Sequence, residues 1–329
     1  MGPAVTAVFQ FIGALFIGAG AGASTAYILA VNIGRIAVLA LITKLTAPKL
    51  DLTQVAVTKT ITVRDPIAPQ KFIYGTDMVS GPIIFADVAG TDNRDLHFTV
   101  ALTGHECDSV LSYRIDNLNI PLSDLSGSQD GTVDTGTYAG VAAVGIRLGT
   151  DTQTSMTELT VPFSSLFNSA HRGRGWAYMA WEFNLVEGSE EVFKTQPTNL
   201  RALLRGYKIY DPRLDSTNGG SGLHRLADDT TWEWSHNPAL CLCHFILDDK
   251  FGMKEEDDRI DWPLVITAAD ICEELVAIPT AATQERYTCN VTFLATQSRK
   301  AVRDELLGAM LGRIVYSQGV WKMWAGAAI

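Results

Sequence analysis

The residues whose types and spacing come closest to a catalytic pattern lie between positions 97 and 108. His97 and His105 are eight residues apart, and Glu106 follows the second histidine. A metal hydrolase of the H-E-x-x-H type needs two ligands on one helix face at short spacing, and that spacing is absent. Glu106 and Asp108 would share one face of a strand, but no third group stands where it would complete a site. We therefore expect His105 and Glu106 to close a turn through hydrogen bonds.

A wall hydrolase would need a carboxylate pair or a Cys/His pair in a cleft. The candidates are Glu182, Glu187, Cys107 and His105, and none of them has a supporting motif. Three cations, Arg205, Lys208 and Arg213, stand isolated in the sequence. The sequence thus predicts no catalytic residue and a protein that is not an enzyme.

Ligand-binding patterns are equally weak. Residues 171–174 lack the spacing of a phosphate-binding loop and precede a strand rather than a helix. The carboxylates of Asp124, Asp130 and Asp134 are too widely spread for a calcium loop, and the acidic run at 255–258 is typical of a solvated loop. No cofactor and no metal site is predicted.

The length, composition and net charge of the chain limit its possible partners. The chain has 329 residues, 47% of them hydrophobic, so two or more folded domains are expected. A net charge of −10 disfavours sequence-independent binding to DNA phosphates. Five cysteines form no C-x-x-C pair, which favours buried thiols in a protein assembled in a reducing cytoplasm. The cysteines are Cys107, Cys241, Cys243, Cys272 and Cys289.

Residues 1–50 differ from the rest because they are largely apolar, with a Gly/Ala hinge at 18–23 and a proline at Pro48. We predict two helices. Three interpretations stay open: the helices pack against other subunits or line an oligomer axis, they insert into a host membrane, or they form a transmembrane hairpin. Asn32 and Arg35 make the last two costly.

The elements that position the candidate residues are mostly strands. Alternation predicts strands over 52–63, 72–75, 81–86, 96–102, 109–120, 141–148 and 176–183. The pair 72–75 and 81–86 should form a meander, and residues 123–140 should form an exposed loop. A short amphipathic piece is expected at 156–167.

Beyond residue 200 the pattern becomes mixed. A strand should lead into a turn at Asp211-Pro212, followed by a polar loop over 214–231. Ser235 is expected to cap a helix, and two further helices are predicted over 262–277 and 301–311. We expect a strand over 286–291. Residues 313–324 should form a hairpin that turns at Gln318-Gly319.

These elements carry an ordered series of motifs that resembles the hub region of siphophage tail-tip proteins, the family of the phage lambda host-specificity protein J. The resemblance runs from Ile61 to about Ala325. Its motifs are RDPIAPQK at 64–71, the 72–75 strand, LHFTVAL at 96–102 running into GHE at 104–106, LGTD at 148–151, HRGRGWAY at 171–178, TNL at 198–200, RGYKIYDPR at 205–213, WSHNPA at 234–239, FGM at 251–253 and RYTCN at 286–290.

The resemblance implies a mainly β, α+β fold with antiparallel, barrel-like hub domains. The implied organisation has N-terminal apolar helices over 1–50, a first hub β-domain over 51–225 with an inserted β-rich domain at about 105–185, and a helical and β second hub domain over 226–329. The chain would be the N-terminal portion of a longer protein.

The same resemblance implies a homotrimer that closes the tail tube of a virion, assembled in the host cytoplasm. Its partners would be a distal tail ring protein, a tape-measure protein and other tail-tip proteins. A host receptor would bind through regions further along the chain, and residues 1–48 would contact the tape measure, the channel or a host membrane. No specific nucleic-acid binding is expected. The alternatives are a tail-associated cell-wall hydrolase and a membrane-anchored adaptor that uses residues 1–48.

Overall fold

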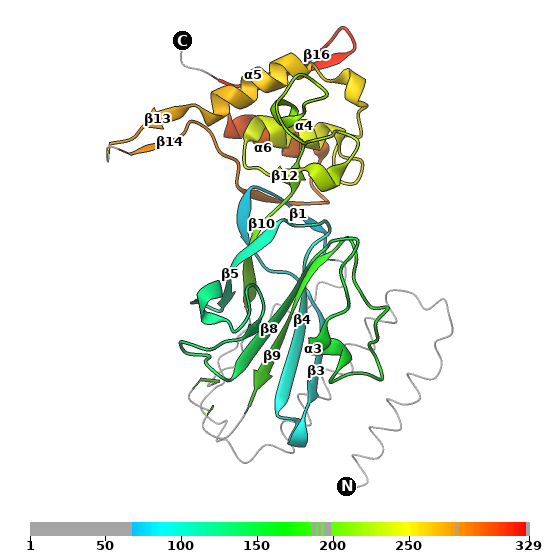
Figure 1. Cartoon of the computed structure of the whole chain (residues 1–329), viewed down its shortest axis with the longest axis vertical. Helices are drawn as coiled ribbons and strands as arrows, with labels where there is room; N and C mark the ends of the chain where they lie inside the picture. Colours follow the sequence, from blue (N-terminus) through cyan, green and yellow to red (C-terminus); the bar gives the residue numbers. More distant parts are fainter. Residues whose placement is uncertain (1–67, 186–188, 190–191, 194–198, 280–281, 327–329) are drawn as a thin grey trace.

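The computed structural model describes residues 68–185, 189, 192–193, 199–279 and 282–326 (Figure 1). The expected helices of residues 1–50 and the strand over 52–63 lie outside the described residues. Within the part of the chain that is described, strands dominate and helices are fewer, which confirms the mainly β, α+β expectation. None of the described helices has the length and apolar character needed to cross a bilayer.

The lower, β-rich part in Figure 1 contains two antiparallel sheets. A four-stranded sheet has the order β2-β10-β5-β6, and a five-stranded sheet has the order β3-β4-β9-β8-β7. Its strands are β2 (Thr76–Val79), β3 (Ile83–Ala89), β4 (Asp95–Thr103), β5 (Ser109–Ile115), β6 (Leu118–Pro121), β7 (Gly131–Thr132), β8 (Ala142–Leu148), β9 (Ala177–Asn184) and β10 (Leu200–Arg205).

One core lies between these two sheets. Tyr113 and Leu204 of the four-stranded sheet and Trp181 and Phe183 of the five-stranded sheet belong to the same buried cluster. The other face of the five-stranded sheet is covered by the segment around helix α3 (Thr157–Thr160), where Met156 is buried. The sheets are open at their edges among the described residues, so the expected barrel-like closure is not seen.

The upper part packs three helices and several short strands around a second core. The helices are α4 (Pro238–Leu247), α5 (Trp262–Glu273) and α6 (Arg299–Ala309). The strands are β11 (Lys208–Ile209), β12 (Glu233–Trp234), β13 (Leu275–Ala277), β14 (Thr283–Glu285), β15 (Val291–Leu294), β16 (Arg313–Ser317) and β17 (Val320–Trp324). The hairpin of β13 and β14 projects to one side in Figure 1.

Strand β1 (Lys71–Tyr74) joins the two cores. Phe72 and Tyr74 belong to the helical core, whereas Ile73 between them belongs to the core of the two sheets. Successive side chains of a strand point to opposite faces, so one short strand serves both. β1 pairs with β15, more than 200 residues away, and not with the 81–86 strand. The expected meander of these two strands was wrong.

Several predicted elements differ from the observed ones in their boundaries. The 109–120 strand is a hairpin of β5 and β6, because Asp116 takes a positive φ of 51° and turns the chain. Residues 123–140 are not simply an exposed loop, since they contain β7 and the buried Leu125 and Val133. The helix predicted over 262–277 ends at Glu273. The strand predicted over 286–291 lies further along the chain, at Val291–Leu294.

The start of the first upper helix was also assigned to the wrong residue. Asn237, not Ser235, caps α4: its side-chain oxygen accepts from the backbone N–H of Ala239 at 3.0 Å and of Leu240 at 3.4 Å. The Ser235 hydroxyl instead accepts from the N–H of Asn237. Pro238 follows the cap at the first helical position, where its missing N–H costs nothing.

Candidate functional site

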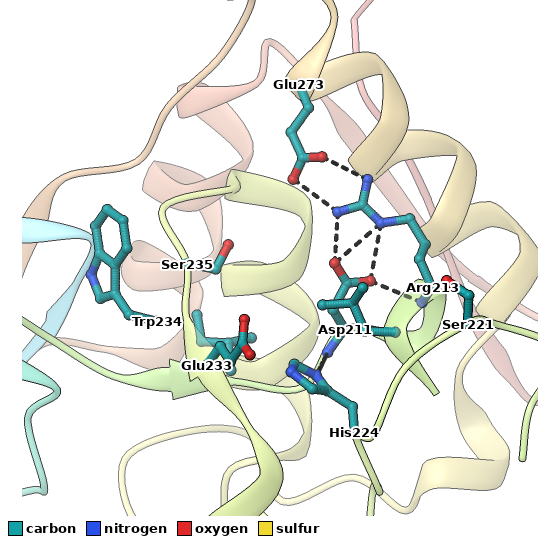
Figure 2. Close-up of a pocket in the computed structure, with 10 residues that line it drawn as sticks. Asp211, Arg213, Ser221, His224, Glu233, Trp234, Ser235 and Glu273 are labelled. Atoms are coloured by element: carbon teal, nitrogen blue, oxygen red, sulfur yellow. Dashed lines mark hydrogen bonds and ion pairs between the residues drawn. The ribbon is translucent and has the colours of Figure 1, made fainter. Parts of the chain in front are cut away.

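The densest polar cluster of the described chain surrounds Arg213, where the segment after β11 meets α5 (Figure 2). Pro212–Leu214 form a short 3-10 helix, η4. Asp211 caps this turn, because its carboxylate accepts from the Arg213 backbone N–H at 2.9 Å. The capped turn directs the Arg213 side chain toward Glu273 at the end of α5.

All five N–H groups of the Arg213 guanidinium have acceptors. Nε donates to Asp211 at 3.0 Å and Nη2 donates to the same carboxylate at 2.6 Å. Two parallel bonds of 2.8 Å join Nη1 and Nη2 to the two oxygens of Glu273, and Nη1 also donates to Asp270 at 2.9 Å. A guanidinium has no further donor, so Arg213 has none left for a phosphate or carboxylate ligand.

Asn237 extends this network from α5 to α4. Its Nδ2 donates to Glu273 Oε1 and to the Ala269 carbonyl, both at 2.9 Å, while its oxygen caps α4. The residue is 1% exposed. One amide therefore joins the start of α4 to the end of α5.

Electrostatics strengthen the network. Partial burial opposes the charge of Glu273, but hydrogen bonds from Arg213 and Asn237 outweigh it and lower the pKa of this carboxyl. Desolvation likewise opposes the charge of Arg213, and its bonds to Asp211, Glu273 and Asp270 raise its pKa. Both groups stay charged across the physiological range.

A pocket of about 450 Å³ adjoins this cluster (Figure 2). Its lining residues are Ile209, Asp211, Arg213, Leu214, Ser221, His224, Glu233, Trp234, Ser235 and Glu273. His224 uses Nδ1 to accept from the Asp211 N–H at 3.0 Å, and Glu273 is committed to Arg213 and Asn237. Asp211, Arg213 and Glu273 thus serve the fold, whereas Nε2 of His224 is buried without a hydrogen-bond partner among the described residues. No described cluster of three His, Cys, Asp or Glu side chains could bind a metal ion.

Comparison with known proteins gives likenesses among solved structures. No family model matches the sequence, and no curated protein matches it. A chain from a structure of the virion of a native gene transfer agent particle is 13% identical with a TM-score of 0.44. The alignment covers 80% of this chain and 53% of that one, so this chain spans about half the length of that virion chain.

His105 and Glu106 form hydrogen bonds as expected, but only one of these bonds is local and the others reach distant segments. His105 Nε2 accepts from the Ile73 N–H at 3.0 Å, and its Nδ1 bonds to the Glu106 carbonyl at 2.6 Å. The Glu106 carboxylate pairs with Lys208 at 2.7 Å. Asp108 accepts from the Ser109 hydroxyl and makes no pair with Glu106 among the described contacts. These residues pin β1 and β11 to the 104–108 turn.

The other hydrolase candidates are not assembled into a site. Cys107 is buried and bonds to Thr103 at 3.3 Å, and desolvation raises the pKa of its thiol to about 12, far from that of a nucleophile. Glu182 lies directly across the sheet from His97, and burial raises the pKa of this carboxyl. Glu187 lies outside the described residues.

The loop candidates remain isolated. In the 255–258 run, Glu255 pairs with Arg259, and the following three carboxylates are exposed. Residues 171–174 are exposed and precede strand β9 rather than a helix, as expected. All five cysteines are buried free thiols.

Sequence reasoning missed the cluster because its members are far apart in the chain. Arg205, Lys208 and Arg213 are not isolated cations, so that expectation was wrong. Arg205 lies over the Trp234 ring at 4.4 Å, Lys208 pairs with Glu106, and Arg213 pairs with residues 57 and 60 positions away. A signal existed in the motifs, since RGYKIYDPR and WSHNPA contribute Arg213 and Asn237 to one network.

Proposed function

We propose that this chain is a structural component of a phage tail tip, a trimeric hub that closes the tail tube and opens for DNA ejection. One observation carries the proposal. Two separate motifs of the resembled tail-tip family provide Arg213 and Asn237, which both bind Glu273, and the first motif also provides Asp211, which binds Arg213. The residues that give the chain its resemblance are therefore those that hold its parts together.

The arrangement of these residues favours a mechanical role. A reacting centre needs at least one donor or acceptor left for substrate, whereas the guanidinium of Arg213 is fully used. Gly206 of the first motif supports the same interpretation. A Cβ at this position would lie 2.1 Å from the Ile73 carbonyl oxygen, so glycine is needed for β1 to pass close by.

In this role the chain would sit in the virion after assembly in the host cytoplasm. It would contact further copies of itself, a distal tail ring protein, a tape-measure protein and other tail-tip proteins. Residues 1–48 would face the channel, bind the tape measure or enter the host membrane when the hub opens.

Images of the purified full chain test the proposal. Averaged particles are expected to show threefold symmetry about a central axis. Particles with a single copy and no symmetry at micromolar concentration would contradict it. Deleting residues 1–48 should leave the trimer intact and impair tail assembly or DNA delivery.

The alternative of a tail-associated wall hydrolase is tested by a peptidoglycan zymogram. Cleared bands would defeat the structural proposal, and Glu182 and Cys107 would be the first residues to substitute. The alternative of a membrane-anchored adaptor is tested by flotation of the full chain and of the chain without residues 1–48 with liposomes. Flotation that depends on residues 1–48 but occurs with a monomer would favour the adaptor.

A further inference from the structure

The four-stranded sheet has one face in the core and one face that no described core cluster covers. Along β10, Leu200, Ala202 and Leu204 are buried, and the residues between them point the other way and are half-buried. Together with their neighbours on β2 and β5 they form what we call the arginine face. It consists of Met78, Arg114, Arg201, Leu203 and Arg205.

The arginine face has an unusual charge pattern. Arg201 lies directly opposite Arg114 in the register of β10 and β5. Like charges at such positions destabilise a sheet. No described carboxylate pairs with Arg114, Arg201 or Arg205, although acidic residues outnumber basic ones by 36 to 26 in the whole chain.

Hydrogen bonding is also incomplete on this face. The Nε atoms of Arg114, Arg201 and Arg205 are buried without a hydrogen-bond partner among the described residues. Arg201 donates through Nη2 to the Asp116 carbonyl, and Arg205 lies over Trp234. Unpaired buried donors and a like-charge pair cost folding free energy, and such costs persist where a function requires them.

The apolar members of the face suit a protein partner. Leu203 lies opposite Met78 in the register, between the rows that hold Arg201 and Arg205. Arginine and methionine are enriched in protein–protein interfaces, where apolar side chains form the centre. The partner surface should therefore carry carboxylates around a small apolar centre.

The chain itself carries a matching surface. Glu256, Asp257 and Asp258 are exposed and make no ion pair in the described structure. Asp257–Arg259 form the short 3-10 helix η6 just before α5, so these carboxylates stand on ordered backbone. We call residues 256–258 the acidic run. Residues 51–67 are a poor alternative occupant, since they carry two acidic and two basic residues.

We propose that the arginine face of one copy binds the acidic run of a neighbouring copy. This inference rests on the self-assembly in the proposed function and assigns the surfaces that make it. The two surfaces are different and are not paired within one chain, so the contact is heterologous. Repetition of a heterologous contact around an axis gives a closed ring. Carboxylates of the neighbour would supply acceptors for guanidinium N–H groups that have none within the chain.

Charge reversal with rescue tests the proposal, using the mass of the full chain in solution as readout. Arg114→Glu with Arg201→Glu should reduce the oligomer to monomers, and Asp257→Arg with Asp258→Arg should do the same. A chain that carries all four substitutions should assemble again, because the arginine face is then negative, the acidic run is positive, and the two surfaces attract each other. Reversal of the exposed Arg172 and Arg174 to Glu is the matched control and should leave assembly unchanged.

The outcomes separate the two proposals. If the wild-type chain assembles and the four-substitution chain does not regain assembly, the assigned contact is wrong while the hub remains. Loss of assembly on reversal of the arginine face alone, with none on reversal of the acidic run, would show that the arginine face binds a different surface of the neighbouring copy, and the assigned contact would be wrong. A wild-type chain that stays monomeric would overturn the hub and this contact together.

A neutral variant distinguishes binding from folding. Arg114→Gln with Arg201→Gln removes the like-charge pair and should raise the melting temperature of the monomer, yet weaken assembly at least tenfold. Assembly of the wild type should also weaken as salt concentration rises. A lower melting temperature with unchanged assembly would mean that the arginines serve the fold, and the proposal would fail.

Discussion

The side-chain amide of Asn237 caps α4 with its oxygen and binds Glu273 of α5 with its nitrogen, at 2.9 Å from Nδ2 to Oε1. Arg213 binds the other side of the same carboxylate. Three segments therefore depend on one carboxyl group. Substitution of any of these three residues should therefore lower the free energy of unfolding by more than the loss of a single helix cap or ion pair.

Replacing Asn237 by alanine should lower the free energy of unfolding by about 2–3 kcal/mol, since the variant loses a helix cap worth about 1 kcal/mol and the two hydrogen bonds that Nδ2 donates to Glu273 and Ala269. Denaturant unfolding measures the change. Ser298→Ala is the control, because Ser298 caps α6 through a single bond to the Ala301 N–H and should cost only about 1 kcal/mol. Equal losses for the two variants would contradict the linking role of Asn237.

Arg213→Lys should cost about 2 kcal/mol, because an ammonium group cannot reproduce two bidentate pairs and leaves carboxylate oxygens without donors. The change is measured in the same unfolding assay. Arg303→Lys is the matched control, since Arg303 pairs only with its neighbour Asp304 at the surface and should change stability by less than about 0.5 kcal/mol. If Arg213→Lys left the free energy of unfolding unchanged, the network would not contribute to stability.

Gly206→Ala should destabilise the chain by more than about 2 kcal/mol, because the new methyl group would meet the Ile73 carbonyl oxygen and push β1 away from the chain after β10. Gly308→Ala in α6 is the opposite case. Its methyl group would meet nothing within 4 Å, and alanine should stabilise the helix by up to about 1 kcal/mol. Thermal unfolding of both variants checks the pair.

Acidification should destabilise the protein partly through His105. Burial lowers the pKa of this imidazole from 6.5 to about 3, so the folded state resists the proton that the unfolded chain takes up. The stability contribution is present above pH 6.5 and is lost as pH falls from 6.5 toward 3. His105→Gln should flatten the decline of melting temperature between pH 7 and 5. His171→Gln, at an exposed turn, should leave the decline unchanged, and identical profiles would exclude a contribution from His105.

The parts of the fold that were predicted correctly depend on local chemistry. The turn at Gln318-Gly319 followed from its residues, and both take positive φ in the hairpin of β16 and β17. Alternation located β8 and β9. The missed turn at Asp116 was also local, since an Asp-Asn pair tolerates the required conformation and should have signalled it.

The rest depends on contacts between distant residues. Nothing near Lys71 indicates that β1 pairs with β15, and nothing near Arg213 indicates Glu273 as its partner. The choice between Ser235 and Asn237 as a cap depends on a proline at the next position, which favours Asn237. The arginine face could not be recognised from the sequence, because it appears only when the register sets Arg114 beside Arg201.

The central claim is that the chain's surfaces serve assembly with copies of itself and not the conversion of a substrate. The most direct test is the native mass of the full chain at micromolar concentration, measured by light scattering or native mass spectrometry. The claim predicts about three times the chain mass of 35.7 kDa. A stable single copy of 35.7 kDa that turns over a substrate would contradict it.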